Sequence, residues 1–169
     1  MVGEITGESI KSAIALKIRS SFAVTTGEPP IAIYPTIYKE KVVQDMKKPC
    51  FFIWVMDVSQ EKLMRNNYER LYQMNIRYHP EEKDPKTYET LADIGNKLLD
   101  YLTNINVPIF LGRYDGEGNP IEDSKPITGR QMNYEIKEDV LQMYVTYKIK
   151  AKQLMEEVPE MEQLEIINR

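Results

Sequence analysis

The chain has 169 residues, of which 42% are hydrophobic and 28% charged, and its net charge is −4. This balance is typical of a single folded domain and excludes a disordered chain. Because no Lys/Arg run exceeds two residues, the basic excess that phosphate binding requires is missing, and we expect no specific nucleic-acid partner.

The chain has one cysteine, Cys50, which excludes an intramolecular disulfide and a cysteine metal cluster within one copy. Its neighbours Pro49 and Phe51 favour a buried, hydrophobic role for it. The first twelve residues lack the apolar core of a signal peptide, and no stretch approaches the roughly 18 apolar residues that span a bilayer. We therefore expect a protein made in a cytoplasm, without a membrane partner.

A first helix is predicted after Ser9, a candidate N-cap, because apolar residues recur at three- and four-residue steps. Its predicted buried stripe is Ile10, Ala13, Ile14, Ile18 and Phe22. Residues 25–30 form a turn-rich connection. Ile31–Tyr38 is predicted as an edge or broken strand, because Pro35 has no N–H to donate to a ladder.

The most hydrophobic stretch, Cys50–Val58, is apolar on both faces apart from Asp57. This pattern predicts a central strand that is covered on both faces, by helices on one and by an arm or a neighbouring subunit on the other. Residues 59–67 are predicted as a polar turn. The alternating segment Tyr68–Tyr78 then forms a strand with one wet face, paired with Cys50–Val58 in a hairpin.

A second helix follows Asp84, a good N-cap, and Pro85, which suits the first helical position. Its predicted buried stripe is Tyr88, Leu91, Ile94, Leu98, Leu102 and Ile105, and Gly95 favours close packing in mid-helix. Residues 106–128 are turn-rich and predict an arm or extended hairpin tipped by "DGEGNP".

Residues 129–152 predict a second hairpin, which turns at "KEDV". Its inward face is Leu141, Met143, Val145, Tyr147 and Ile149. The fold class is therefore α+β: a mainly antiparallel (mixed) sheet with two helices packed on one face, in one domain over residues 1–150. Residues 151–169 are predicted as an acidic C-terminal tail or helix.

No catalytic constellation emerges. His79 is the only histidine, and no serine or cysteine lies in a nucleophile motif. Asp57 and Glu61 could serve a metal-dependent nuclease, but a solvated turn is the favoured interpretation. "YDGEGNPIED" lacks the ligand spacing of a calcium loop, and the eight glycines form no phosphate loop. We expect no enzyme, no metal and no cofactor, and a binding or structural role instead.

Several short sequence motifs resemble those of the phage tail terminator family. These are Ile37–Tyr38, "KKPCFF" at 47–52, the polar turn at 59–67, the strand over 65–80 that ends in Tyr-x-Pro, and "MNYEIKEDVLQMYVTYKIK" at 132–150. The chain departs from the family pattern in a longer insert at 106–126 and in the acidic residues after Lys150.

The resemblance implies a structural protein of a virion or phage-tail-like particle, assembled in the bacterial cytoplasm. Such proteins form a hexameric ring on the last ring of the tail tube, stop its polymerisation and offer a surface to the head, collar or sheath end. The implied partners are other copies, the tail tube protein, and a sheath, collar or head-connector protein. Another neck component, such as a head–tail connector, is the alternative.

A closed ring requires head-to-tail contacts between copies, and exposed loops and strand edges suit such contacts. For contacts with the tube or a neighbouring copy, the candidates are Lys62, Arg65, Asn66 and Arg70 in and after the polar turn, and Phe110, Arg113 and Tyr114 in the arm.

Overall fold

The computed structural model describes residues 4–39, 44–81 and 87–152. Ten elements follow in chain order: α1 (Gly7–Ser21), β1 (Val24–Thr26), β2 (Ile31–Ile33), β3 (Thr36–Tyr38), β4 (Cys50–Lys62), β5 (Asn67–His79), α2 (Thr87–Leu102), β6 (Asn104–Tyr114), β7 (Pro120–Lys137) and β8 (Val140–Lys152). The predicted caps Asp84 and Pro85, and residues 153–169 of the predicted tail, lie outside the described residues.

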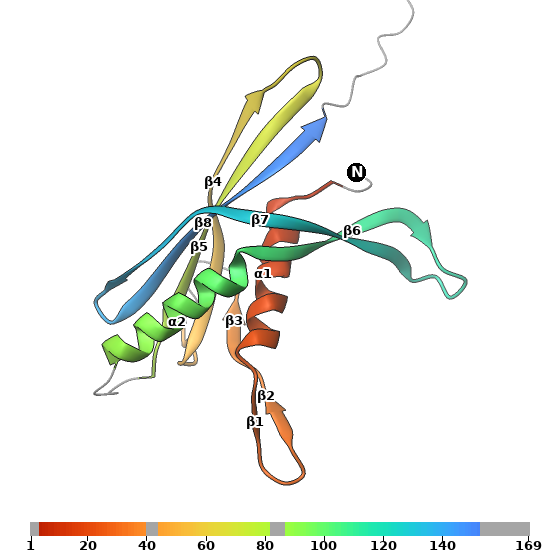
Figure 1. Ribbon diagram of the computed structural model, residues 1–169. Coiled ribbons are helices and arrows are strands. Elements are labelled where there is room, and N and C mark those ends of the chain that lie inside the picture. The colour runs from red at the N-terminus through yellow and green to blue at the C-terminus, as the bar shows by residue number, and fades with distance from the viewer. Residues whose placement is uncertain (1–3, 40–43, 82–86, 153–169) are drawn as a thin grey trace, which may run out of the picture.

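Six strands form one sheet in the order β3-β4-β5-β8-β7-β6, and β1 pairs with β2 in a separate hairpin (Figure 1). All neighbours in the large sheet are antiparallel except β3 and β4, which run parallel. Side chains from both helices join one core cluster with side chains from a single face of this sheet. The predicted α+β class, with a mixed sheet and two helices on one face, is confirmed.

The first helix begins earlier than predicted. Thr6 is the N-cap and accepts a hydrogen bond from the backbone N–H of Ser9, whose side chain in turn accepts from the backbone N–H of Thr6. Ser9 is therefore the third residue of a reciprocal capping box rather than the cap itself. The predicted stripe is confirmed: Ile10, Ala13, Ile14 and Ile18 are buried, and Phe22 packs at the margin of the core.

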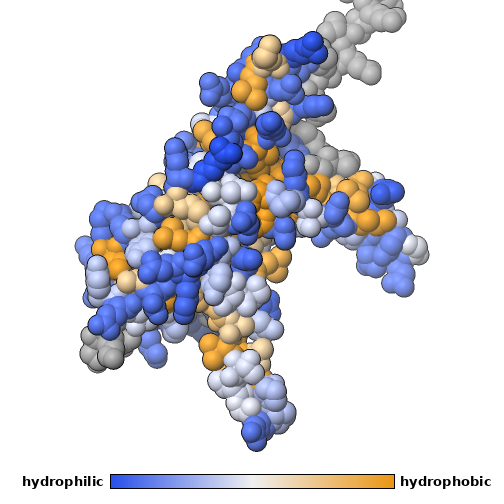
Figure 2. Space-filling model, in the orientation of Figure 1, coloured by the Kyte–Doolittle hydropathy of each residue, from blue (hydrophilic) through white to orange (hydrophobic). Residues whose placement is uncertain are grey.

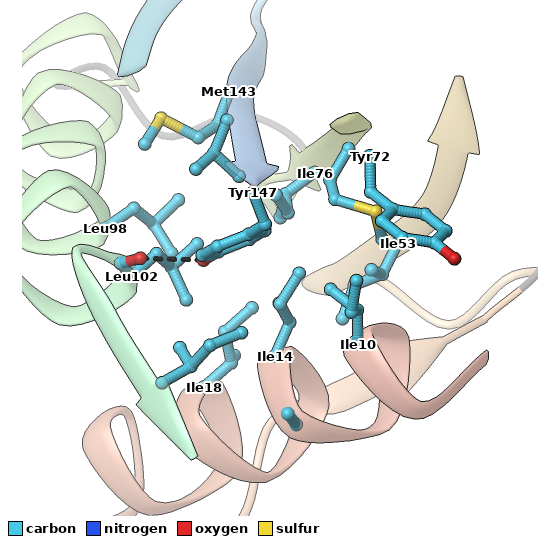
Figure 3. Close-up of a cluster of buried hydrophobic side chains, with 14 of the residues drawn as sticks. Ile10, Ile14, Ile18, Ile53, Tyr72, Ile76, Leu98, Leu102, Met143 and Tyr147 are labelled. Atoms are coloured by element: carbon cyan, nitrogen blue, oxygen red, sulfur yellow. Dashed lines mark hydrogen bonds between the residues drawn. The ribbon is translucent and has the colours of Figure 1, made fainter. Parts of the chain in front are cut away.

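The centre of the core lies where α2 meets β8 (Figure 3). Leu98 and Leu102 of α2 face Met143 and Tyr147 of β8 there. The buried Tyr147 hydroxyl donates a 2.7 Å hydrogen bond to the Leu102 carbonyl, and burial raises the pKa of this phenol. One polar bond inside an apolar cluster fixes how the helix end sits on the sheet, because an unsatisfied buried carbonyl is costly.

The stripe predicted for the second helix needs two corrections. Tyr88 is exposed, because it lies near the start of α2 and outside the core cluster. Ile105 is buried but belongs to β6, since α2 ends at Leu102. Gly95 fulfils its predicted role: a Cβ there would lie only 2.9 Å from the ring of Tyr134.

The hydrophobic segment is covered over only part of its length. Residues 50–53 are buried, but the strand continues to Lys62 and is exposed from Met56 onward. The predicted polar turn at 59–67 is therefore too long, because most of it is strand. The arm does not cover the second face: Phe52 there packs against Tyr38 and His79, whereas the base of the arm packs against the helices. Cover by a neighbouring subunit stays a prediction.

The long strand β7 changes partner midway. Residues 120–128 pair with β6, and residues 129–137 pair with β8. Gly129 lies at the change, donates a 2.7 Å hydrogen bond to the Thr103 carbonyl, and is followed by a bulge at Gln131, whose φ is 50°. The predicted arm and the predicted second hairpin thus share one continuous strand, which redirects the arm away from the sheet.

Gly129→Ala is expected to lower the free energy of unfolding by about 1–3 kcal/mol, because overpacking a fixed core is destabilising. The added Cβ would lie 2.8 Å from Val145 and 3.0 Å from the Leu102 carbonyl oxygen. Gly116→Ala is the matched control, since its Cβ would meet nothing within 4 Å. Urea unfolding of both variants measures the difference, and equal stabilities would contradict this account.

Candidate interaction surfaces

Three projections leave the body in different directions (Figure 1). The first, the three-stranded projection, consists of the outer parts of β4, β5 and β8, where Asn67 pairs with Lys152 near the tip. The second is the β6–β7 arm, and the third is the β1–β2 hairpin. Both helices pack near the middle of the molecule, so these projections have surfaces that no helix covers.

The tip of the three-stranded projection holds three of the predicted contact residues. Lys62 ends β4, and Arg65 lies in the turn with φ of 59°. Both are exposed, and Asn66 beside them is half-buried. The turn also exposes Leu63 and Met64, the latter to 83%. The polar turn predicted from sequence therefore has an apolar component, and arginine and methionine, both exposed here, are enriched at protein–protein interfaces.

Arg70, the fourth residue predicted for contacts in and after the polar turn, makes contacts within one copy, and its role in contacts with other copies stays a prediction. Its guanidinium forms a 2.6 Å ion pair with Glu4 and a 2.6 Å hydrogen bond to Gln60. The hydrogen bond that Arg70 donates to Glu4 is the main reason why the pKa of Arg70 is raised. Next to it, the Tyr72 hydroxyl donates to the carbonyl of Ile5. Arg70 therefore holds the start of the chain against the projection.

The β6–β7 arm holds the other predicted contact residues. The ring of Phe110 lies 5.5 Å from that of Tyr114, whose side chain is 65% exposed, and Arg113 between them is also exposed. The carboxylate of Asp115 organises the tip by accepting hydrogen bonds from the backbone N–H groups of Glu117 and Asn119, which lowers its pKa. The turn is therefore ordered, and it presents the aromatic pair beside it.

The β1–β2 hairpin has an exposed apolar face that the sequence did not predict, because residues 25–30 were expected to form only a turn-rich connection. The pairing register places Val24 opposite Ile33 and Thr26 opposite Ile31, so the three large apolar side chains share one face. Each is more than half exposed. An isolated two-stranded hairpin is marginally stable in water, so this face is suited to a partner.

Two open hollows flank the base of this hairpin. One, of about 400 Å³, continues its apolar face and is lined by Phe22, Pro35, Phe51, Tyr78 and Ile94 among others. The other, of about 530 Å³, lies between α1 and β3 and combines apolar side chains with Arg19 and Lys39. Figure 2 shows hydrophobic surface at the base of this hairpin and on the three-stranded projection.

Residues considered for chemistry are dispersed. Asp57 and Glu61 lie exposed along β4 opposite Gln73 and Glu69. Within the described ranges, no three His, Cys, Asp or Glu side chains gather as metal ligands do. Burial, with the charges of Lys48 and Arg77, lowers the pKa of His79. Neither described helix has the length and apolar composition needed to cross a membrane.

The comparison with protein families decides what these surfaces belong to. A family model described as phage tail terminator protein matches residues 9–159. The chain belongs to the phage tail terminator family. A search of curated proteins finds no match. The terminator is thus a phage tail component, and the resemblance inferred from the sequence is confirmed.

Within one copy, the terminator does not bring its predicted contact residues together. Lys62, Arg65 and Asn66 lie at the tip of one projection, whereas Phe110, Arg113 and Tyr114 lie on another that points elsewhere (Figure 1). Their role in contacts therefore stays a prediction. If both sets act, they act on different partners or on different parts of one partner.

Arg70→Met is expected to lower the free energy of unfolding by about 0.5–1 kcal/mol, the usual size for a half-exposed ion pair. Glu4→Gln should have a similar effect, and a double-mutant cycle should show coupling between the two. Lys62→Met, on the exposed tip, is the control and should change stability by less than about 0.5 kcal/mol. Absence of coupling would mean that the Arg70–Glu4 pair does not hold the start of the chain.

Cys50 is expected to resist thiol reagents in the folded protein. It is fully buried, and burial raises the pKa of its thiol against the opposing effect of Lys48. Because the thiolate is the reactive form, labelling at pH 8 should be slow in buffer and fast in urea. Rapid labelling of the folded terminator would show that β4 opens at its buried end.

Proposed function

We propose that this tail terminator forms a ring of six copies on the end of the tail tube, which stops tube polymerisation and offers a surface to a head, collar or sheath end. The observation that carries the proposal is the set of three projections whose apolar side chains lie exposed. Soluble monomers rarely expose such patches unless a partner covers them.

Free strand edges support the same proposal. β4 pairs with β3 only over Cys50–Phe52, so its outer residues have one edge without a strand partner among the described residues. In the outer part of β8, residues 148–152 pair with β5 alone in the same described set. Unpaired edges of this length invite pairing with another chain.

A closed ring needs two different surfaces on each copy, one at each side of the contact. The terminator offers projections that extend from the body and hollows at the base of the β1–β2 hairpin. A projection of one copy can meet the body of the next, and repetition of that contact closes the ring. The tip at Lys62–Asn66 and the aromatic pair of the arm then serve the tube or a neighbouring copy.

Electron microscopy of the purified terminator with its tail tube protein tests this proposal. Six-fold rings should decorate one end of each tube, and added terminator should shorten the tubes. The double variant Lys62→Glu with Arg65→Glu should weaken capping by about tenfold in the concentration required, since reversing contact charges replaces attraction with repulsion. Circular dichroism checks that the fold is unchanged.

Lys97→Glu with Lys137→Glu is the matched control, because both lysines are exposed outside the three projections and the change in net charge is the same. It should cap tubes as the wild type does. A terminator that stays monomeric, never reaches tube ends and leaves tube length unchanged would overturn the proposal. Binding to a head component without tube binding would favour the connector alternative.

A further inference from the structure

The net charge of the chain resides in its last 17 residues. The chain has 26 acidic and 22 basic residues, and residues 153–169 contain five glutamates and one arginine. The preceding 152 residues therefore hold 21 of each sign and have no net charge. We refer to residues 153–169 as the acidic segment.

The acidic segment is also rich in apolar residues. Its sequence, "QLMEEVPEMEQLEIINR", intersperses the glutamates with Leu154, Met155, Val158, Met161, Leu164, Ile166 and Ile167. Charged segments that remain disordered contain few large apolar residues, whereas segments that bind a partner often alternate acidic and apolar residues. A matching surface would present cations around an apolar floor.

The hollow between α1 and β3 has this chemistry, and we refer to it as the basic hollow. Its apolar lining comes from Ala15, Leu16, Pro35 and Ile37, and Leu16 is 60% exposed. With Ser12 and Arg19, which also line the hollow, these α1 residues follow three- and four-residue steps and form one continuous outer stripe on the helix.

Two cations line the basic hollow. The guanidinium of Arg19 lies 4.4 Å from the centre of the Tyr34 ring, and the Lys39 ammonium donates a 3.0 Å hydrogen bond to Ser12. Neither forms an ion pair with a carboxylate among the described residues. Both cations are held in place by neutral groups, so their charge is available to an acidic ligand.

The described chain stops at the tip of a projection rather than beside the basic hollow. β8 ends at Lys152, beside Asn67 at the tip of the three-stranded projection. In Figure 1 this tip lies at the top of the molecule and β3 lies in the body below it. Seventeen extended residues reach roughly 56–60 Å, which is enough to leave one copy and cross a neighbouring one.

We propose that the acidic segment of one copy binds the basic hollow of a neighbouring copy. The glutamates pair with Arg19 and Lys39, and the apolar side chains cover Leu16 and Ile37. The inference rests on the proposed ring, in which copies lie side by side, and it assigns one of the contacts between them.

A labelled peptide of residues 153–169 tests the contact directly. Its target is the full chain in which all five glutamates of the acidic segment are glutamine, so that the hollow has no competing acidic segment. We expect saturable binding that weakens with salt, as ion pairs near the surface do. Adding Arg19→Glu and Lys39→Glu to the target should weaken binding about tenfold, whereas adding Lys97→Glu and Lys125→Glu should leave it unchanged.

A mixing experiment distinguishes a neighbour from the same copy. The glutamine variant keeps the hollow but lacks the acidic charges, and the Arg19→Glu, Lys39→Glu chain keeps the acidic charges but lacks the cations. With different fluorophores on the two full-length variants, energy transfer in the mixture should exceed that of either variant mixed with itself. Equal transfer in all three mixtures, or peptide binding that ignores the hollow charges, would overturn the inference.

The outcome is separable from that of the ring proposal. If the glutamine variant and the wild type cap tubes equally and the peptide does not bind, the ring stands and this contact is wrong. If the peptide binds and mixed copies associate while no variant reaches a tube end, the contact stands and the capping function is wrong.

Discussion

The burial of one sheet face beneath α1 and α2 is the interaction on which the rest of the terminator depends. β4, β5 and β8 supply a continuous apolar surface, and the two helices close it with branched aliphatic side chains. Within this cluster, a hydrogen bond from the Tyr147 hydroxyl joins the end of α2 to β8. Because burial of apolar area is the main favourable term in folding, this layer anchors everything that extends beyond it.

The strands are longer than the layer that covers them, and this mismatch produces the projections. β4, β5 and β8 each have 13 residues, yet only their inner parts lie under the helices. β7 has 18 residues and changes partner at Gly129, from β6 in the arm to β8 in the body. Strand pairing inside each projection satisfies much of its backbone, whereas its apolar side chains remain exposed. A rigid body with extended, partly apolar arms is suited to assembly with other copies.

The charge of the chain is unevenly distributed between its body and its acidic segment. Residues 1–152 are neutral overall, so repulsion between bodies does not oppose their close approach in a ring. The excess negative charge is confined to one segment, and the cations around the basic hollow are positioned by an aromatic ring and a serine. Burial of apolar surface can hold copies together, and the charges of the acidic segment can determine which surface of a neighbouring copy it binds.

The sequence by itself determined the α+β class, the core stripe of α1, the inward face of β8 and the turn at residues 138–139, because local periodicity and turn residues encode them. Short sequence motifs, such as "KKPCFF" at 47–52, also indicated the tail terminator family. It did not determine how far β4 is covered, since an apolar run looks the same under a helix or in solvent. Likewise, it did not determine the ion pair of Arg70, because Glu4 lies 66 positions away in the sequence and only folding brings the two together.

The hairpin at 24–33 and the basic hollow were decided by the tertiary structure alone. Val24, Ile31 and Ile33 share a face only because of the register between two short strands. Arg19 and Lys39 line one hollow only because β3 lies beside α1. Such surfaces arise from long-range packing, which a pattern within one segment does not contain.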